Sequence, residues 1–246
     1  LAVDANATLS AERFKGMFSV TNPNFMNSDK STFFNVQAIE IDQLTDFGYK
    51  TNKTGFELGT KFEYLEDVYL GLSTSTFVEK IETDSTASAR QKAQTGNYLD
   101  TFLKFNFNVD KRNQKFKTTD GYTTNYGLSM PLVSDTNTVT NSFNYKIYSE
   151  LYENNVSSLS ILLKGSTSLT NDDIKLSERL FLPSSKLRGF ESGKVGPKDG
   201  NDFIGGNFIS AINLQSTLPI LFQNSQNLDA VIFFDAANIW GVDYDS

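Results

Sequence analysis

The feature that most constrains the fold of this chain is a repeated alternation of apolar and polar residues. In residues 101–110 it is clean, because Leu103, Phe105, Phe107 and Val109 share one face and every intervening residue is polar. A period of two places successive side chains on opposite faces of a β-strand. The pattern recurs, with varying regularity, in ten further segments: 2–9, 12–22, 31–42, 56–64, 68–80, 120–130, 143–151, 159–166, 208–218 and 227–240. The alternation therefore predicts an all-β fold of about eleven strands.

Two further patterns refine this prediction. Segment 227–240 is apolar on both faces, so we expect its inner side to pack against another part of the chain. No segment carries the apolar stripe of a helix longer than a turn or two; residues 87–94 have helix propensity without such a stripe.

The composition excludes several kinds of chemistry. The 246 residues include no cysteine and no histidine, which rules out disulfides, thiol nucleophiles, Ser-His-Asp triads and the usual zinc sites. The net charge is -7, and no basic stripe of the kind that binds nucleic acid is present. The composition therefore argues against these catalytic and zinc sites, and we expect no cofactor, no metal and no nucleic-acid partner.

The connections between the predicted strands differ in length. Short turns are expected at 22–24, 65–67, 154–155 and 224–227, and longer polar loops at 43–54, 83–97, 131–141 and above all 169–207. Residues 110–121 are an exception. Successive connections alternate between the two ends of a barrel, and this order places 110–121 at the end with the short turns, although it is long. Short turns at one end and long loops at the other are typical of a transmembrane antiparallel β-barrel of the outer-membrane type.

A soluble β-sandwich or a lipocalin-like barrel has the same alternation, with its apolar face turned inward. No apolar run approaches the roughly 18–20 residues of a transmembrane helix. A barrel that alternates apolar and polar residues averages to a neutral hydropathy, however, so this observation does not exclude a membrane. Three features favour the membrane barrel: aromatic residues share the aliphatic face, the polar face is rich in Asn, Ser, Thr and Gly, and the strand count exceeds that of a lipocalin.

The stretch from Leu187 to Asn207 interrupts the strands. It reads LRGFESGKVGPKDGNDFIGGN, too rich in Gly, Lys and Asp for a strand. We interpret it as part of a long loop that folds into the barrel lumen and is held there by Arg188. A phosphate cradle at Gly205-Gly206 is disfavoured, because no helix or Gly-Lys-Ser follows, and a flexible return to the next strand is the simpler interpretation.

Several motifs together resemble one family. They are Leu187-Arg188-Gly189-Phe190, Gly196-Pro197-Lys198-Asp199, Ile204-Gly205-Gly206-Asn207, the strand FFDAANIW at 233–240, Glu178-Arg179-Leu180-Phe181, and Val20-Thr21-Asn22-Pro23-Asn24-Phe25. Across essentially the whole chain they resemble the C-terminal barrel of the BamA family, the outer-membrane β-barrel assembly factors of the bacterial surface antigen superfamily. That barrel has sixteen strands, so the resemblance implies that residues 1–246 are a partial barrel with an inward-folded loop at 169–207. The first and last strands and the N-terminal periplasmic domains are then absent.

The resemblance also implies a function. It implies a non-enzymatic factor of the Gram-negative outer membrane, a multi-pass β-barrel that folds and inserts other barrel proteins. The implied partners are unfolded outer-membrane protein clients, outer-membrane lipids, accessory assembly lipoproteins and periplasmic chaperones. A protein-secretion pore of the same superfamily, a passive porin and a soluble lipid-binding barrel remain open alternatives.

The resemblance further implies how the inward loop is held. Arg188 is expected to pair with Asp235, and a second acidic position of the family falls here on Gln215, which accepts a hydrogen bond but adds no charge. Gly189 permits the backbone angle of a tight turn, and Phe190 is expected to anchor that turn in apolar contacts. The remaining positions of the loop motif are Leu187, Gly196, Pro197, Gly205, Gly206 and Asn207.

Overall fold

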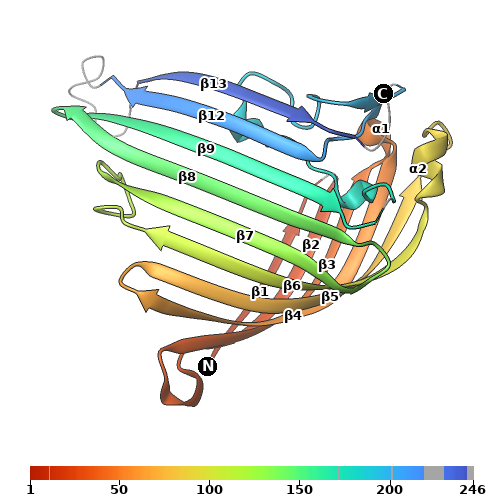
Figure 1. Ribbon diagram of the computed structural model, residues 1–246, viewed down its shortest axis with the longest axis horizontal. Helices are drawn as coiled ribbons and strands as arrows, with labels where there is room; N and C mark the ends of the chain where they lie inside the picture. Colours follow the sequence, from red (N-terminus) through yellow and green to blue (C-terminus); the bar gives the residue numbers. More distant parts are fainter. Residues whose placement is uncertain (11, 171, 201, 219–229, 243–246) are drawn as a thin grey trace.

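The computed structural model describes residues 1–10, 12–170, 172–200, 202–218 and 230–242. Within them, eleven strands form one antiparallel sheet in which almost every strand pairs with its neighbour in sequence (Figure 1). The strands are β1 (Ala2–Leu9), β2 (Arg13–Asn22), β3 (Lys30–Gln43), β4 (Tyr49–Leu65), β5 (Val68–Thr83), β6 (Gly96–Asp110), β7 (Gly121–Ser134), β8 (Thr138–Tyr152), β9 (Asn155–Ser168), β12 (Phe208–Thr217) and β13 (Val231–Trp240). The predicted all-β fold and strand count are confirmed, and the sheet is curved and open rather than closed.

Helices are short throughout the described ranges. They are α1 (Leu44–Phe47), α2 (Ala89–Ala93) and three single 3-10 turns, η1 (Phe25–Asn27), η2 (Leu176–Glu178) and η3 (Ser184–Lys186). None of the helices in this part of the chain is long and apolar enough to cross a membrane. The predicted propensity at 87–94 is realised in α2, which starts at a capping box: the Ser88 side chain accepts from the Gln91 backbone, and the Gln91 side chain accepts in return from Ser88.

Two of the predicted long loops are wrong. Residues 43–54 contain only the four-residue α1 before β4 begins at Tyr49, and residues 131–141 are mostly strand, because β7 runs to Ser134 and β8 starts at Thr138. Their polar residues lie on both faces of these strands; Lys50, for example, shares the outer face of β4 with Phe56 and Leu58 and lies 2.7 Å from Glu40 on the adjacent strand. Polar composition therefore did not mark the ends of these strands. The turn predicted at 224–227 lies outside the described residues.

The two faces of the sheet are reversed relative to a soluble barrel. On β5, Leu72 and Val78 are 49% and 56% exposed on the outer face, while Ser75 and Glu79 of the inner face are buried. The same arrangement holds on β4 and β12, where the exposed residues are Phe56, Leu58, Ile212 and Leu214. An apolar outer surface around a partly polar interior is the arrangement of outer-membrane barrels.

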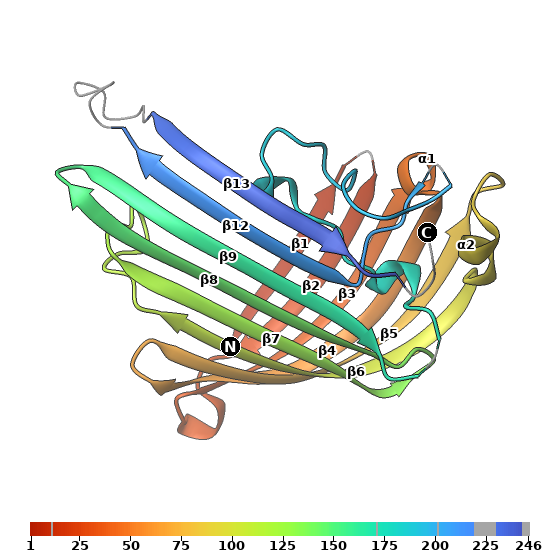
Figure 2. The same cartoon turned by 45° about the horizontal axis from the view of Figure 1, so that its top comes forward.

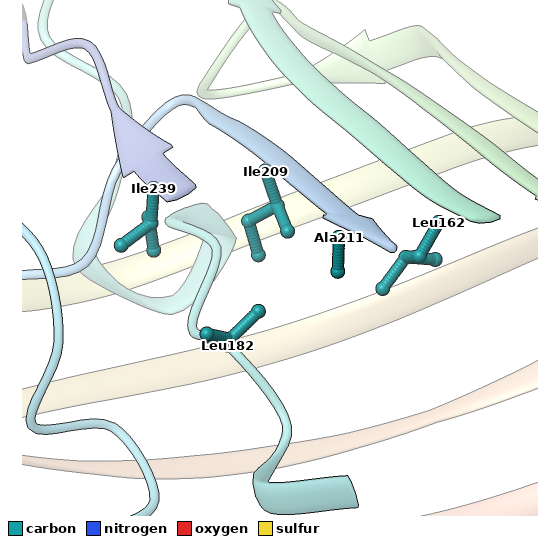
Figure 3. Packing of buried hydrophobic residues seen from close by; sticks show 5 residues of the cluster. All are labelled: Leu162, Leu182, Ile209, Ala211 and Ile239. Atoms are coloured by element: carbon teal, nitrogen blue, oxygen red, sulfur yellow. The ribbon is translucent and has the colours of Figure 1, made fainter. Parts of the chain in front are cut away.

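The interior of the curve is occupied by the connection between β9 and β12, residues 169–207 (Figure 2). It carries the two-stranded hairpin of β10 (Lys198–Asp199) and β11 (Asp202–Phe203). Its apolar residues enter two separate clusters. Leu182 packs with Leu162, Ile209, Ala211 and Ile239 of β9, β12 and β13 (Figure 3). Leu176 packs with Phe47, Tyr49 and Ile81, at the ends of α1, β4 and β5.

Candidate functional site

The register of β12 and β13 sets up the wall of the candidate site. Asn213 lies directly opposite Asp235, and Gln215 lies opposite Phe233. Because side chains alternate along a strand, these four residues all project from the same face. That face is the inner one, since Ala211 and Ile239 of the same sets are buried beneath the connection.

The connection reaches this wall through a tight turn after η3. Lys186 and Leu187 each donate a backbone hydrogen bond to a carbonyl three residues earlier, and Phe190 does the same to Leu187. Gly189 has a φ of 88°, in the left-handed region that glycine occupies without strain. Leu187 packs against the cluster around Ile209, which leaves the Arg188 side chain directed at β13.

Arg188 is held by four hydrogen bonds. Its Nε donates to Oδ2 of Asp235 at 2.7 Å and its Nη2 to Oδ1 at 2.7 Å, so the guanidinium grips both carboxylate oxygens. The Arg188 backbone N–H also donates to Oδ2 of Asp235, at 3.0 Å. Nη1 donates to Oε1 of Gln215 at 3.0 Å. The structure thus brings together the three residues that the resemblance implies, and we call Arg188, Asp235 and Gln215 the clamp.

Burial and neighbouring groups strengthen the clamp. The Asp235 side chain is only 4% exposed, and the Arg188 side chain 31%. The hydrogen bonds to Asp235 raise the pKa of the Arg188 guanidinium. The guanidinium carbon also lies 3.6 Å from the centre of the Phe233 ring, a cation–π contact with the inner face of β13. The predicted packing of the inner side of 227–240 is therefore confirmed at this residue.

Asn213 is a clamp partner that sequence reasoning missed. Its Nδ2 donates to Oδ1 of Asp235 and to the carbonyl of Lys186, both at 2.9 Å, so one amide links the wall to the turn. With this bond, Asp235 accepts four hydrogen bonds and has both oxygens satisfied. The available signal was its position, two residues before Gln215 on the same strand face.

Phe190 does not play the expected part. We expected it to anchor the turn in apolar contacts, but its side chain is 60% exposed. The turn is instead held by the clamp and by Leu187, whose side chain packs on the wall.

The glycines of the loop motif mark close contacts. A Cβ on Gly196 would lie 2.3 Å from Cγ2 of Ile239, and a Cβ on Gly206 would lie 2.7 Å from the Trp240 carbonyl oxygen. Gly206 and Leu180 exchange two backbone hydrogen bonds of 2.9 Å. The expected flexible return at Gly205-Gly206 is therefore wrong, because this segment is pressed between the start of the connection and the end of β13.

The other motif positions lie around this return. Asn207 is buried, and its Oδ1 accepts from Nη1 of Arg179 at 3.4 Å. The Pro197 carbonyl accepts from the Ile204 N–H at 3.1 Å, which closes the small hairpin. Within the described residues, no three His, Cys, Asp or Glu side chains gather as metal ligands would.

A second polar contact between connection and sheet was also missed. The ammonium of Lys175 is buried and contacts Glu79 of β5, Asp100 of β6 and Glu178 of the connection. No local pattern joins these residues, because Asp100 and Lys175 are 75 positions apart. The connection is therefore attached to the sheet by charged groups at two places, near its start at Lys175 and near its middle at Arg188.

Comparisons with known proteins agree with the all-β fold described above. A family model described as the Omp85 superfamily domain matches residues 2–246. Among solved structures, the chain is similar to BamA from Haemophilus ducreyi lacking POTRA domains 1-3, with a TM-score of 0.88 and 20% sequence identity. The similarity covers 97% of this chain and 52% of the other, so the chain spans about half the length of that relative. At this identity the likeness shows the fold. None of the curated proteins matches the sequence.

Proposed function

The chain belongs to the Omp85 superfamily, and from this premise we propose that it is part of an outer-membrane barrel that folds and inserts other β-barrel proteins. In this proposal residues 1–246 belong to the C-terminal barrel domain of a BamA-like assembly factor. The solved structure it resembles is named BamA, and the likeness extends over nearly all of this chain.

The observation that carries the proposal is a sheet whose apolar face points outward and whose inner face is covered by the attached connection 169–207. Apolar side chains such as Leu72, Val78 and Leu214 point outward, where acyl chains of the outer membrane would cover them. At roughly 25 cal/mol per Å² of apolar area, burial against lipid favours this location over water. We therefore place the protein in the Gram-negative outer membrane, with outer-membrane lipids as its first partners.

The interior supports a non-enzymatic role. The connection 169–207 lies across the inner face and is attached to it at the clamp and at Lys175. Ordering a segment costs about 1–2 kcal/mol of conformational entropy per residue, and these attachments offset that cost. They indicate that the function requires the connection to be held in this position. We propose that the loop supports the barrel wall while a client strand pairs with an exposed strand edge elsewhere in the barrel.

The remaining partners follow from the proposed role. An assembly factor receives unfolded outer-membrane proteins from periplasmic chaperones and works beside accessory assembly lipoproteins. Each of these contacts is a proposal for the whole protein, of which this chain covers the barrel part.

Reconstitution tests the proposal directly. The natural gene product is inserted into vesicles of outer-membrane phospholipid, and a urea-denatured eight-stranded barrel protein is added. We expect the client to fold several-fold faster than in protein-free vesicles, measured by the shift of the folded client in unheated electrophoresis. Equal client folding rates in the two kinds of vesicle would refute the proposal.

The same vesicles distinguish the two membrane-bound alternatives, the secretion pore and the passive porin. A secretion pore of the superfamily would export one dedicated partner and leave general clients unaffected. A passive porin would conduct ions steadily across a planar bilayer without accelerating any client. Conductance and client folding measured side by side therefore separate the three functions.

A further inference from the structure

The connection contains a lysine that is almost completely removed from solvent. The Lys175 side chain is 1% exposed, and its Nζ lies 2.8 Å from Oε2 of Glu79 and 3.5 Å from Oε1 of Glu178. It also donates to Oδ2 of Asp100, and it lies 4.9 Å from the centre of the Tyr98 ring. The side chains of Glu79 and Asp100 are themselves 1% and 0% exposed. We call these four charged residues the lysine cage.

Each carboxylate of the cage is oriented by a further hydrogen bond. Ser177 Oγ donates to Oε2 of Glu79 at 2.9 Å, and Thr136 Oγ1 donates to Oε1 of Glu178 at 3.3 Å. Ser134 donates to Asp100. These donors come from the connection and from the β7–β8 end of the sheet, so the cage joins several elements at one point.

The backbone beside Lys175 is attached to the sheet as well. The Leu176 N–H donates to Oε1 of Gln94 at 2.7 Å, and Gln94 Nε2 donates to the Ile174 carbonyl at 3.4 Å. Ser166 Oγ of β9 donates to the Glu178 carbonyl at 3.1 Å. Residues 174–178 are therefore docked on the wall formed by β5, β6 and the turn after α2.

The next residues cross to the opposite wall. Leu180 and Leu182 pack in the cluster formed with β9, β12 and β13, whereas Phe181 packs in the cluster around Phe47. The Phe181 and Phe47 rings lie 5.1 Å apart. Successive residues of one extended segment thus contact two different groups of strands. Six residues further on, the segment reaches the clamp on β13 through Arg188.

We propose that Lys175 is a positioning residue that anchors the start of the inward loop to β5 and β6, so that residues 174–188 brace this wall against β12 and β13. The inference deepens the proposed function and rests on it where client assembly is concerned. The anchor itself is a property of the loop and is measured without any client.

The chemistry of the cage explains why one side chain matters. A buried ion pair stabilises only when each charge is compensated, and removal of one partner leaves the others in a dry environment. Burial opposes the charge on Lys175, but Glu178, Glu79 and Asp100 outweigh it and raise the pKa of the ammonium. Loss of the lysine therefore leaves three carboxylates facing one another without their cation.

Two thiol reporters make the anchor measurable, because the chain has no cysteine of its own. The first reporter is Ser166→Cys, a nearly isosteric change at a residue that is 1% exposed and lies against the Glu178 carbonyl. The second is Ala211→Cys, at a residue that is 1% exposed and packs against Leu182. Each reacts with a maleimide only when its part of the loop lifts. The natural gene product is refolded in detergent, and the retained heat-modifiable mobility shows that the barrel is intact.

Lys175→Met is the test variant. We expect thiol labelling at position 166 to become about tenfold faster or more, with a smaller change at position 211, because the clamp remains. Lys80→Met is the matched control: its ammonium pairs with Glu82 on the exposed side of β5, at 2.5 Å, and labelling should stay at the wild-type rate. Wild-type labelling at position 166 in Lys175→Met would overturn the proposal.

A compensated variant separates anchoring from folding. In Lys175→Met with Glu79→Gln and Asp100→Asn, only one of the three cage carboxylates, Glu178, remains, so we expect labelling at position 166 to fall back toward the wild-type rate. A compensated variant that labels faster than Lys175→Met alone would overturn the proposal. If Lys175→Met does not fold, the compensated variant is compared with the wild type, and labelling at position 166 more than about tenfold faster than in the wild type would overturn the proposal. Faster labelling with unchanged client folding would keep the anchor and remove the loop from the proposed assembly function.

Discussion

Replacement of Arg188 by alanine is the most direct test of the clamp. The change removes two 2.7 Å hydrogen bonds to Asp235, the bond to Gln215 and the contact with the Phe233 ring. Asp235, whose side chain is 4% exposed in the wild-type protein, then keeps Asn213 and one backbone N–H as its donors among the described residues. We expect the part of the loop near the clamp to detach more often, while the barrel stays folded.

The magnitude follows from the geometry. Breaking a fully buried ion pair costs about 3–5 kcal/mol. The Arg188 side chain is 31% exposed, so solvent screens part of the interaction and about 2–3 kcal/mol is the appropriate range. At about 1.4 kcal/mol per factor of ten, the open population rises about 30- to 150-fold.

The assay is maleimide labelling of Ala211→Cys in the Arg188→Ala background, in the natural gene product. Arg112→Ala is the matched control, because Arg112 grips Asp110 with the same two 2.7 Å hydrogen bonds but lies in the turn after β6. We expect fast labelling in the first variant, slow labelling in the second, and slower client folding only in the first. A labelling rate for Arg188→Ala within about twofold of wild type would refute the energetic reasoning.

Three further predictions concern the loop and its supports. Gly196→Ala should open the loop far more than Gly189→Ala, because a Cβ at position 196 would lie 2.3 Å from Ile239, whereas none of the described atoms lies within 4 Å of a Cβ at position 189. Gly189→Ala costs only about 1–2 kcal/mol of backbone strain. The rate of labelling at position 211 ranks the two variants. Gln215→Glu gives the guanidinium a second carboxylate and should slow labelling about two- to fivefold at neutral pH, an effect that high salt reduces. Burial raises the pKa of Glu178, so the folded loop holds that proton more tightly than the unfolded chain, and the stability it contributes is present at low pH and lost as the pH rises through the raised value. Glu178→Gln should therefore flatten the pH dependence of loop release above the ordinary glutamate pKa. Loop release is followed by proteolysis, with all samples quenched at one pH, and an unchanged slope contradicts the assignment.

Much of the sheet was predictable because its signal is local. The alternation at 101–110 defines both the strand and its two faces without reference to any other segment, and β6 spans it from Gly96 to Asp110. The same signal failed at 43–54 and 131–141, where polar residues on both faces of the strands resemble a loop. The pairing of Arg188 with Asp235 came from resemblance to a family, since no local rule joins residues 47 positions apart.

The alternating sequence by itself determined an antiparallel sheet with one apolar and one mixed face. Tertiary structure decided which face is enclosed, and what encloses it. Curvature of the sheet brings β5 and β6 within reach of residues 174–178, and only there do Lys175, Glu79 and Asp100 meet. The path of the connection leaves Phe190 exposed and brings the Lys186 carbonyl to Asn213. Strand formation depends on neighbours two residues apart, whereas these contacts depend on how far the whole sheet bends, a property that no short segment encodes.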